Sequence, residues 1–378
     1  MADAVRIETV RRADAVVVKV GTNVLTDRAG ALDQGRVREL AAQLSRARAG
    51  GRKVGLVSSG AIGAGVGRLG LARRPVDLPH LQACAAVGQC ALMQAYQDAL
   101  TPFGVHAAQI LLTAGDFDNR VRYLNARHTI LTLFEYGCLP IINENDTVSV
   151  AEIRFGDNDH LAAMVANLLQ APLLVLLTNV DGLYTADPRV DPSASLVATV
   201  PHIDKSVTDM AAPTQSELGT GGMRSKLRAA RLTTSAGGAV IMANGSRPGI
   251  LDEVFAGEPV GTLFLAHGES LSARRRWLGL TARPKGAFHL DDGARKAVER
   301  DGRSLLPVGV LAVAGTFGKG DVVSLCDRDG IEFARGLTNY STADAERIRG
   351  LATEQILRAV GKVPYVEMVH RDNLAVVG

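Results

Sequence analysis

Short apolar runs rich in Val, Ile and Leu alternate with longer segments of helical spacing through the first 270 residues. The runs are typical of buried parallel β-strands and cover residues 15–20, 54–57, 106–112, 139–142, 173–177, 239–242 and 262–266. The intervening segments predict helices at residues 33–49, 80–100, 123–135, 161–169 and 223–234. Strands that alternate with helices predict an α/β fold with a doubly wound, mainly parallel sheet, which binds ligands at the carboxyl ends of its strands.

The pattern changes after residue 271, where a basic stretch carries the single tryptophan, Trp277. Beyond it, short alternating apolar and polar runs occur at 308–313, 321–325 and 331–335, with Gly and Asp between them. These runs predict a small β-rich domain. We therefore expect a first domain at residues 1–273, a linker at 274–284 and a second domain at 285–378.

The composition is that of an ordinary globular protein, with 47% apolar and 21% charged residues in a chain of 378. A formal net charge of +3 is too small to indicate a nucleic-acid or membrane partner. No apolar run approaches the roughly 18 residues of a membrane span, and the amino terminus has no pattern of a signal peptide. We therefore expect a cytoplasmic protein that does not contact membranes.

The stretch from 143 to 159 holds a dense set of acids and amides. They are Asn143, Glu144, Asn145, Asp146, Glu152, Asp157, Asn158 and Asp159. They follow the strand predicted at 139–142, so we expect them at the carboxyl edge of the sheet. So many polar groups are costly to bury unless a cation or hydrogen-bond donors fill the loop. The alternative is a solvated loop in which Asp157 or Asn158 caps the next helix.

Glycine-rich junctions occur at 19–22, 58–65 and 219–226, at strand ends or before a predicted helix. Glycine lets the backbone approach an anion, and the N–H groups at a helix start point at it. Lys19 interrupts an apolar strand and Lys226 ends the last junction, so we expect both lysines to meet an anion. The alternatives are ordinary glycine turns and a lysine that extends its ammonium group into water.

Two common nucleotide motifs are missing from the sequence. A G-x-G-x-x-G string at Gly65, Gly67 and Gly70 does not directly follow a strand, and residues 85–95 contain no acid. No Walker A string occurs either. The two lysines, the glycine loops and the acid and amide loop instead suit phosphoryl transfer, which needs positioning and charge neutralisation. A carboxylate acceptor is already ionised at neutral pH, so it would need no general base.

Several strings resemble the amino-acid kinase family, in the order found in its glutamate-phosphorylating members. They are VVVKVGTNVL, VSSGAIGAG, LPIINENDTV, RFGDNDHLAA, LLTNVDGLYTADPR and GTGGMRSKLRAA. The last third, from KGAFHLDDGARKAV through GTFGKGDVVSL to GLTNYS, resembles a PUA domain. The resemblance covers almost the whole chain. It implies a three-layer αβα fold with a mainly parallel sheet, followed by a small β-rich PUA domain.

The resemblance also implies a reaction and its participants. ATP would phosphorylate the side-chain carboxylate of L-glutamate to L-glutamyl 5-phosphate, the first step of proline biosynthesis, and Mg²⁺ would accompany the nucleotide. It further implies feedback inhibition by proline and a homo-oligomer, either a dimer or a tetramer. The protein ligands of Mg²⁺ and the role of the PUA-like domain stay open.

Carried over position by position, the resemblance implies three groups of site residues. Lys19 and Lys226 would contact the transferred phosphoryl group, and Asp159 would orient both lysines. Ser59, Asp146 and Asn158 would hold glutamate. The nucleotide pocket would be lined by Lys19, Thr178, Asn179, Thr220, Gly221, Gly222, Met223, Arg224, Ser225 and Lys226. Asn179 stands where family members often have Asp, which bears on the detail of the nucleotide contacts.

Alternatives remain within and outside this family. Asp146 and Glu144 suit a free ammonium group, which favours glutamate over acetylglutamate as the acceptor. Acetylglutamate kinase and UMP kinase are alternative activities for a protein of the same fold. RNA binding is a rival of another class, because PUA domains elsewhere bind RNA. The 13 Lys and Arg residues from 285 to 378 are balanced by 13 Asp and Glu, so RNA binding is not favoured.

Overall fold

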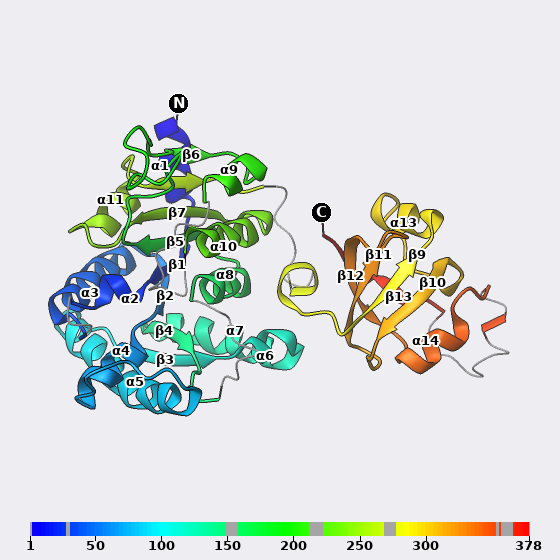
Figure 1. Ribbon diagram of the computed structural model, residues 1–378, viewed down its shortest axis with the longest axis horizontal. Helices are drawn as coiled ribbons and strands as arrows, with labels where there is room; N and C mark the ends of the chain where they lie inside the picture. The colour runs from blue at the N-terminus through cyan, green and yellow to red at the C-terminus, as the bar shows by residue number, and fades with distance from the viewer. Residues whose placement is uncertain are drawn as a thin grey trace. The chain divides into compact units, whose positions relative to one another are not determined.

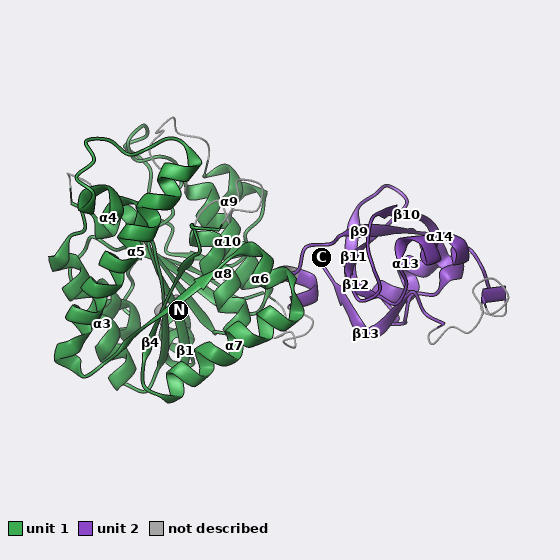
Figure 2. Ribbon diagram, turned by 90° about the horizontal axis from the view of Figure 1, so that it is seen from below, with its two compact units in different colours: residues 1–270 green, residues 271–378 purple. Residues whose placement is uncertain are grey.

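The computed structural model describes residues 2–27, 31–148, 158–211, 222–267, 277–352, 355–356 and 366–377. The chain divides into unit 1, residues 1–270, and unit 2, residues 271–378 (Figure 2). Each unit has its own sheet and its own hydrophobic core. The predicted domain limits and the predicted linker at 274–284 remain predictions.

Unit 1 is built on an eight-stranded sheet. Its strands, in order across the sheet, are β3 (Ala107–Leu112), β4 (Leu139–Glu144), β2 (Lys53–Ser58), β1 (Ala15–Val20), β5 (Leu173–Thr178), β7 (Ala239–Asn244), β8 (Thr262–Phe264) and β6 (Thr199–Val200). Every described pair of neighbours is parallel except β7 and β8. The prediction of a mainly parallel α/β sheet is confirmed. The central strands β4, β2, β1 and β5 therefore end at one common edge.

Helices cover both faces of this sheet. They are α1 (Ala2–Arg11), α2 (Thr22–Leu25), α3 (Gln34–Ala49), α4 (Ala61–Arg68), α5 (Leu78–Leu100), α6 (Ala114–Asp118), α7 (Arg120–Glu135), α8 (Asn158–Leu169), α9 (Lys205–Asp209), α10 (Met223–Ser235) and α11 (Ile250–Ala256). Figure 1 shows α3, α4 and α5 on one side of the strands and α7, α8 and α10 on the other. The unit thus has the three layers that the resemblance implies.

Strand β1 explains how a lysine enters this core. Successive side chains of a strand point to opposite faces of the sheet. Val16, Val18 and Val20 belong to the core that includes residues of α3 and α5. Lys19 therefore points to the other face, where α8 packs against β1 and provides Asp159. The same alternation that buries three valines thus directs the lysine ammonium group toward the start of α8.

Helix α4 was not predicted, because its glycines were interpreted as a junction. It crosses α5 at very short range: an added Cβ at Gly65 would lie 1.8 Å from the carbonyl oxygen of Cys84. An added Cβ at Gly88 would likewise lie 1.7 Å from the carbonyl oxygen of Ala61. Glycine at these two positions is what allows the backbones to approach. Within the G-x-G-x-x-G string, Gly65 thus serves helix packing.

Unit 2 has a five-stranded sheet in the order β10 (Val310–Gly315), β9 (Gly286–Leu290), β11 (Val322–Cys326), β12 (Glu332–Thr338) and β13 (Val369–Val376). Among its described residues, the helices α13 (Asp292–Glu299), η4 (Pro307–Gly309) and α14 (Thr342–Ile348) accompany it. Its core gathers Phe288, Phe317, Phe333 and their apolar neighbours. The short helix η3 (Trp277–Thr281) packs against β12 and β13 and buries Trp277. The predicted small β-rich domain is confirmed.

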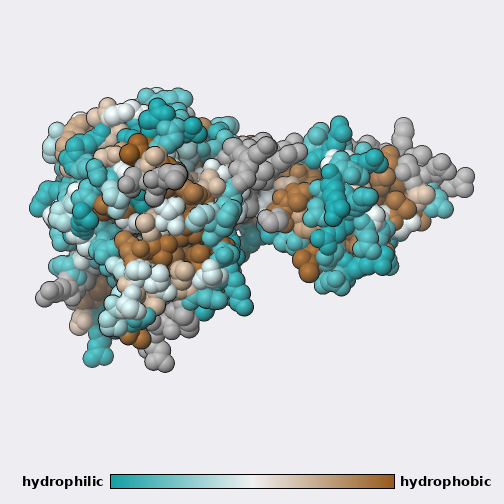
Figure 3. Space-filling model, turned by 90° about the horizontal axis from the view of Figure 1, so that it is seen from above, coloured by the Kyte–Doolittle hydropathy of each residue, from teal (hydrophilic) through white to brown (hydrophobic). Residues whose placement is uncertain are grey.

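The surface is mostly polar in the view of Figure 3, where hydrophobic residues lie among hydrophilic ones in both units. None of the described helices is both long enough and apolar enough to cross a membrane.

The close approach of α4 and α5 leads to a stability prediction. Gly65→Ala must push the two helices apart, and we expect it to lower the free energy of unfolding by about 1–3 kcal/mol. Gly67→Ala is a matched control in the same helix, since its added Cβ would lie 4.0 Å from the nearest atom, Ala31 Cβ. Alanine also favours a helix over glycine by about 1 kcal/mol. Urea unfolding compares the variants, and equal stability would contradict the account of the packing.

Candidate active site

Three charged side chains from separate elements meet at the carboxyl edge of the sheet. Lys19 Nζ lies 2.6 Å from Asp159 Oδ1, and Lys226 Nζ lies 3.0 Å from Asp159 Oδ2. Lys19 belongs to β1, Asp159 to the first turn of α8 and Lys226 to the first turn of α10. Two lysines 207 residues apart in sequence therefore lie within reach of one small anionic group.

This group of charges is almost completely buried. The side chain of Asp159 is 0% exposed, and those of Lys19 and Lys226 are 7% and 10% exposed. Lys19 thus does not extend into water, which was the alternative for a lysine in an apolar strand. Burial opposes ionisation of Asp159, but attraction and hydrogen bonds from both lysines outweigh it, so its pKa lies below the ordinary value. Two ammonium groups and one carboxylate leave an excess of one positive charge, which favours an anionic ligand.

The start of α10 adds polar groups next to these charges. Ser225 Oγ lies 3.1 Å from Asp159 Oδ2 and 2.8 Å from the carbonyl oxygen of Gly222, so its one hydroxyl proton can be donated to either acceptor. Gly222 is the N-cap residue, and its side-chain-free position leaves the backbone N–H groups at the helix start without a side-chain cap among the described residues. Met223 is half-buried, whereas Arg224 turns away and donates to the carbonyl oxygen of Ala211 at 3.3 Å. Thr220 and Gly221, also predicted for the nucleotide pocket, lie outside the described residues.

The predicted glutamate residues lie on the β2 and β4 side of the charged group. Asn158 Nδ2 donates to Ser59 Oγ at 2.8 Å and to Asn143 Oδ1 at 2.9 Å. Ser59 directly follows β2, and Asn158 is the first residue of α8. Asp146 is half-buried in the turn just beyond β4. Ser59 and Asn158 are thus in direct contact, and Asp146 follows the end of β4, the strand that pairs with β2.

The predicted nucleotide residues at β5 lie at the same edge. Thr178 is the last residue of β5 and is buried, and its Oγ1 donates to Asn179 Oδ1 at 3.3 Å. Asn179 is exposed. Beside it, Asn244 Nδ2 at the end of β7 donates to Asp181 Oδ1 at 2.9 Å. The ends of β5 and β7 therefore form a polar edge next to the lysines.

Sequence reasoning missed some of the polar contacts in this region. Asn143 was noted in the acid and amide loop but was given no role, and it contacts both Asn158 and Gln89. Gln89 and Tyr96 lie in the middle of α5, where only their polar character in a buried helix face signals a contact. Tyr96 OH lies 2.8 Å from Ser58 Oγ, and burial raises its pKa far above the ordinary value.

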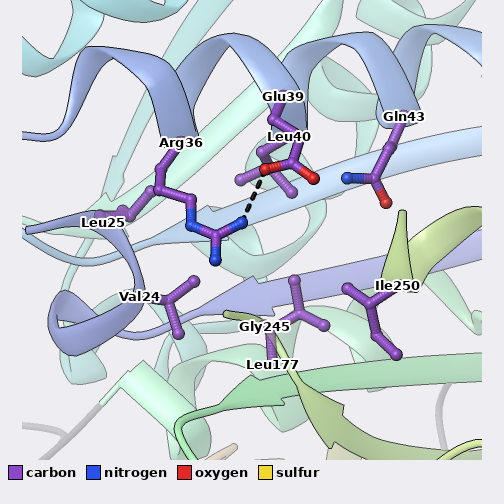
Figure 4. A pocket seen from close by; sticks show the side chains of 9 residues that line it. All are labelled: Val24, Leu25, Arg36, Glu39, Leu40, Gln43, Leu177, Gly245 and Ile250. Carbon is purple, nitrogen blue, oxygen red and sulfur yellow. Dashed lines mark hydrogen bonds and ion pairs between the residues drawn. The ribbon is translucent and has the colours of Figure 1, made fainter. Parts of the chain in front are cut away.

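A small pocket lies nearby but is too small for a substrate. It encloses about 10 Å³, room for at most one water molecule, and is lined by Val24, Leu25, Arg36, Glu39, Leu40, Gln43, Leu177, Gly245 and Ile250 (Figure 4). Glu39 Oε1 accepts from the backbone N–H of Gly249, and Gln43 Oε1 accepts from that of Leu251. Helix α3 thus anchors the start of α11, and the pocket wall has a structural role.

The side chains that could act as metal ligands decide how a metal ion could be held. No group of three His, Cys, Asp or Glu side chains suited to a metal ion occurs among the described residues. Asp159 already binds two ammonium groups with its two oxygens. Mg²⁺ is often held largely by substrate phosphates and water. The described residues therefore fit Mg²⁺ as an ion that the phosphates of a nucleotide carry.

Comparison with protein families identifies both units. Residues 14–244 match the model of the amino acid kinase family, and residues 286–360 match that of the PUA domain. Similar solved structures include UMP kinase from Bacillus anthracis, at 17% identity over 68% of this chain and 97% of that one, with a TM-score of 0.47. Carbamate kinase from Giardia lamblia has 18% identity over 68% of this chain and 99% of that one, with a TM-score of 0.49.

Curated relatives match along nearly the whole chain. Glutamate 5-kinase from Geobacter sp. (strain M21) is 47% identical, over 98% of this chain and 99% of its own length. Glutamate 5-kinase from Geobacter sulfurreducens is 48% identical, over 96% of this chain and 97% of its own length. Glutamate 5-kinase from Nitrosococcus oceani is 48% identical, over 95% of this chain and 96% of its own length. With the charged site and the layered sheet, these matches show that the chain is a kinase, with a carboxyl-terminal PUA domain, and belongs to the amino acid kinase family.

Proposed function

We propose that this kinase transfers the γ-phosphoryl group of ATP to the side-chain carboxylate of L-glutamate, forming L-glutamyl 5-phosphate and ADP. The observation that carries the proposal is the contact of Lys19 and Lys226 with the single carboxylate of Asp159. The names of the full-length relatives support glutamate as the acceptor. Among the rival acceptors, a nucleoside monophosphate or N-acetylglutamate lacks the free α-ammonium group that the half-buried Asp146 suits.

The lysines act on the charge of the transferred group. Each ammonium group has three N–H donors, so one can bind Asp159 while the others bind phosphoryl oxygens. One oxygen of the glutamate carboxylate attacks the γ-phosphorus, the bond from this phosphorus to the bridging oxygen breaks, and ADP leaves with that oxygen. No proton is transferred, because the acceptor is already ionised. Catalysis then depends on positioning and on neutralising the charge of the transition state.

The nucleotide lies on the α10 side of the lysines in this account. The backbone N–H groups at the start of α10, near Gly222 and Met223, have no side-chain cap in the described part of the chain and suit phosphate oxygens. Thr178 and Asn179 offer polar groups at the end of β5. Mg²⁺, carried by the phosphates, supplies further neutralisation of negative charge when it is bound. Asp159 keeps both lysines directed at the γ-phosphate.

Glutamate lies on the opposite side, toward β2 and β4. Ser59 and Asn158 supply hydrogen bonds there, and Asp146 attracts the α-ammonium group.

Proline carries the same α-carboxylate and a cationic amine, so we propose that it competes for these groups and inhibits the enzyme. We further propose that the chain acts in the cytoplasm as a dimer or tetramer. Edge strand β3 supports an assembly, because Ile110 and Leu111 are only half-buried.

An acceptor assay tests the reaction. The chain is incubated with ATP, Mg²⁺ and hydroxylamine, and ADP and hydroxamate are measured with L-glutamate, N-acetyl-L-glutamate or UMP. We expect ADP and hydroxamate together with L-glutamate alone, because hydroxylamine traps an acyl phosphate. ADP release that depends on N-acetylglutamate or UMP, without a response to L-glutamate, would overturn the proposal.

Removal of either lysine charge should lower turnover. We expect Lys19→Met and Lys226→Met each to lower kcat by about 10²–10³-fold with smaller changes in KM, because the charges act mainly in the transition state. Lys53→Met is the control, since Lys53 is exposed at the start of β2, at the opposite edge of the sheet. Steady-state kinetics measures all three variants. Turnover of either site variant close to that of Lys53→Met would refute the role of the lysines.

Asp159 should stabilise the fold in a pH-dependent way. Its folded-state pKa is depressed, so its contribution is fully present above the unfolded pKa near 3.8 and is lost as pH falls through the lower folded pKa. We expect Asp159→Asn to lower the free energy of unfolding by about 3–5 kcal/mol at pH 7, because two buried ammonium groups lose their partner. Denaturant unfolding from pH 7 downward should show this difference narrowing only below about pH 4. A difference that is absent at pH 7 would contradict this assignment.

A further inference from the structure

A line of hydrogen-bonded amides connects helix α5 with the proposed glutamate site. Gln89 Oε1 accepts from Asn143 Nδ2 at 3.0 Å. Asn143 Oδ1 in turn accepts from Asn158 Nδ2 at 2.9 Å, and Asn158 Nδ2 also donates to Ser59 Oγ at 2.8 Å. The contacts run from α5 through β4 to α8 and β2. A residue in the helix layer therefore contacts the site through two asparagines.

The line has a direction, because an amide has a donor end and an acceptor end. Gln89 offers its oxygen, so the amino group of Asn143 faces α5 and its oxygen faces Asn158. The backbone N–H of Glu144 donates to the same Asn143 oxygen at 2.9 Å and supports this orientation. The amino group of Asn158 then faces Asn143 and Ser59, which leaves its carbonyl oxygen on the other side.

This orientation sets what the site offers to a ligand. Asn158 Oδ1 has no hydrogen-bond partner among the residues that the structure describes, so it can accept from an ammonium group. Ser59 Oγ accepts from Asn158, so its own hydroxyl proton is free to be donated to a carboxylate. One acceptor beside one donor matches the ammonium and carboxylate groups of an α-amino acid.

The burial of Gln89 shows that this amide is not an ordinary surface residue. Gln89 is 8% exposed, and its Nε2 is a buried donor with no partner among the described residues. A buried donor without a partner costs stability, and leucine at this position would avoid the cost. Glutamine can accept a hydrogen bond from Asn143 Nδ2, and leucine cannot.

We propose that Gln89 is a positioning residue which, through Asn143, holds Asn158 in the orientation that selects acceptors with a free α-ammonium group. The inference rests on the proposed phosphorylation of glutamate. Without Gln89, the amino group of Asn143 is buried without an acceptor, so this amide is held only through its oxygen, by Glu144 N–H and Asn158 Nδ2, and its position is less firmly fixed. Asn158 then keeps its contacts with Ser59 Oγ and the Ser58 carbonyl oxygen but has a less firmly held partner in Asn143, so it presents its amino group to the ammonium group for part of the time.

The test compares L-glutamate with glutarate, the same dicarboxylate without the amino group. In Gln89→Leu, we expect the KM for L-glutamate to rise about tenfold and the preference for L-glutamate over glutarate, measured as kcat/KM, to fall about tenfold. The KM for ATP should stay within about twofold, because the nucleotide lies on the α10 side. Gln89→Met is a second variant, with a flexible side chain that fits irregular space.

Tyr96→Phe is the matched control. It also removes a buried hydrogen bond between α5 and the end of β2, to Ser58 Oγ. Ser58 contacts Asn158 through its backbone carbonyl oxygen and not through this hydroxyl, so the variant leaves the line of amides intact. We expect it to keep the preference for L-glutamate within about twofold. Thermal unfolding of each variant records the loss of stability. A smaller folded fraction lowers the measured rate and raises the KM for every substrate, whereas the preference for L-glutamate over glutarate does not depend on it.

The outcomes separate this inference from the proposed function. If the wild-type chain releases no ADP in response to glutamate, the proposed function fails and the inference fails with it. If the wild-type chain phosphorylates glutamate and both Gln89 variants keep its preference over glutarate, the inference alone is overturned. An equal loss of preference in Tyr96→Phe would also overturn it, because the effect would then be general to α5.

Discussion

The carboxylate of Asp159 is the constraint on which the site depends. It holds Lys19 and Lys226 at 2.6 and 3.0 Å in a region where all three side chains are almost fully buried. Removing Asp159 would leave two buried ammonium groups without a counter-charge, whereas removing one lysine would leave a neutral pair, so the carboxylate holds the arrangement together. With all three present, one positive charge remains in excess. The folded chain thus carries a preformed attraction for an anion at one edge of its sheet.

The fold produces this arrangement through simple geometry. Parallel strands end together, so residues after β1, β2, β4 and β5 share one edge although they are far apart in sequence. Alternation along β1 directs Lys19 away from the valine core and toward α8. Helix α8 places Asp159 beside Lys19 because the apolar residues along the helix are buried and fix its position. The site is therefore fixed by the same packing that stabilises unit 1.

Much of this could be predicted from the sequence, and the reasons are local. Lys19 is conspicuous because it interrupts a run of valines, and the acids and amides after β4 are conspicuous because of their density. The alternation of apolar runs with helical segments was enough to predict the parallel sheet. Helix α4 was missed because Gly65 and its neighbouring glycines have low helix propensity, and only contact with α5 explains them. Gln89 was missed because one glutamine in a long helix carries no signal until its neighbours in space are known.

A structure of the chain with MgADP, an aluminium fluoride mimic of the phosphoryl group and L-glutamate tests the central claim most directly. We expect Lys19 Nζ and Lys226 Nζ both to lie about 2.7–2.9 Å from oxygen-equivalent atoms of the one mimic, with the glutamate side-chain carboxylate in line on its far side. Both ammonium groups should keep their contact with Asp159. A mimic bound by neither lysine, or by one alone with the other still directed elsewhere, would contradict the account.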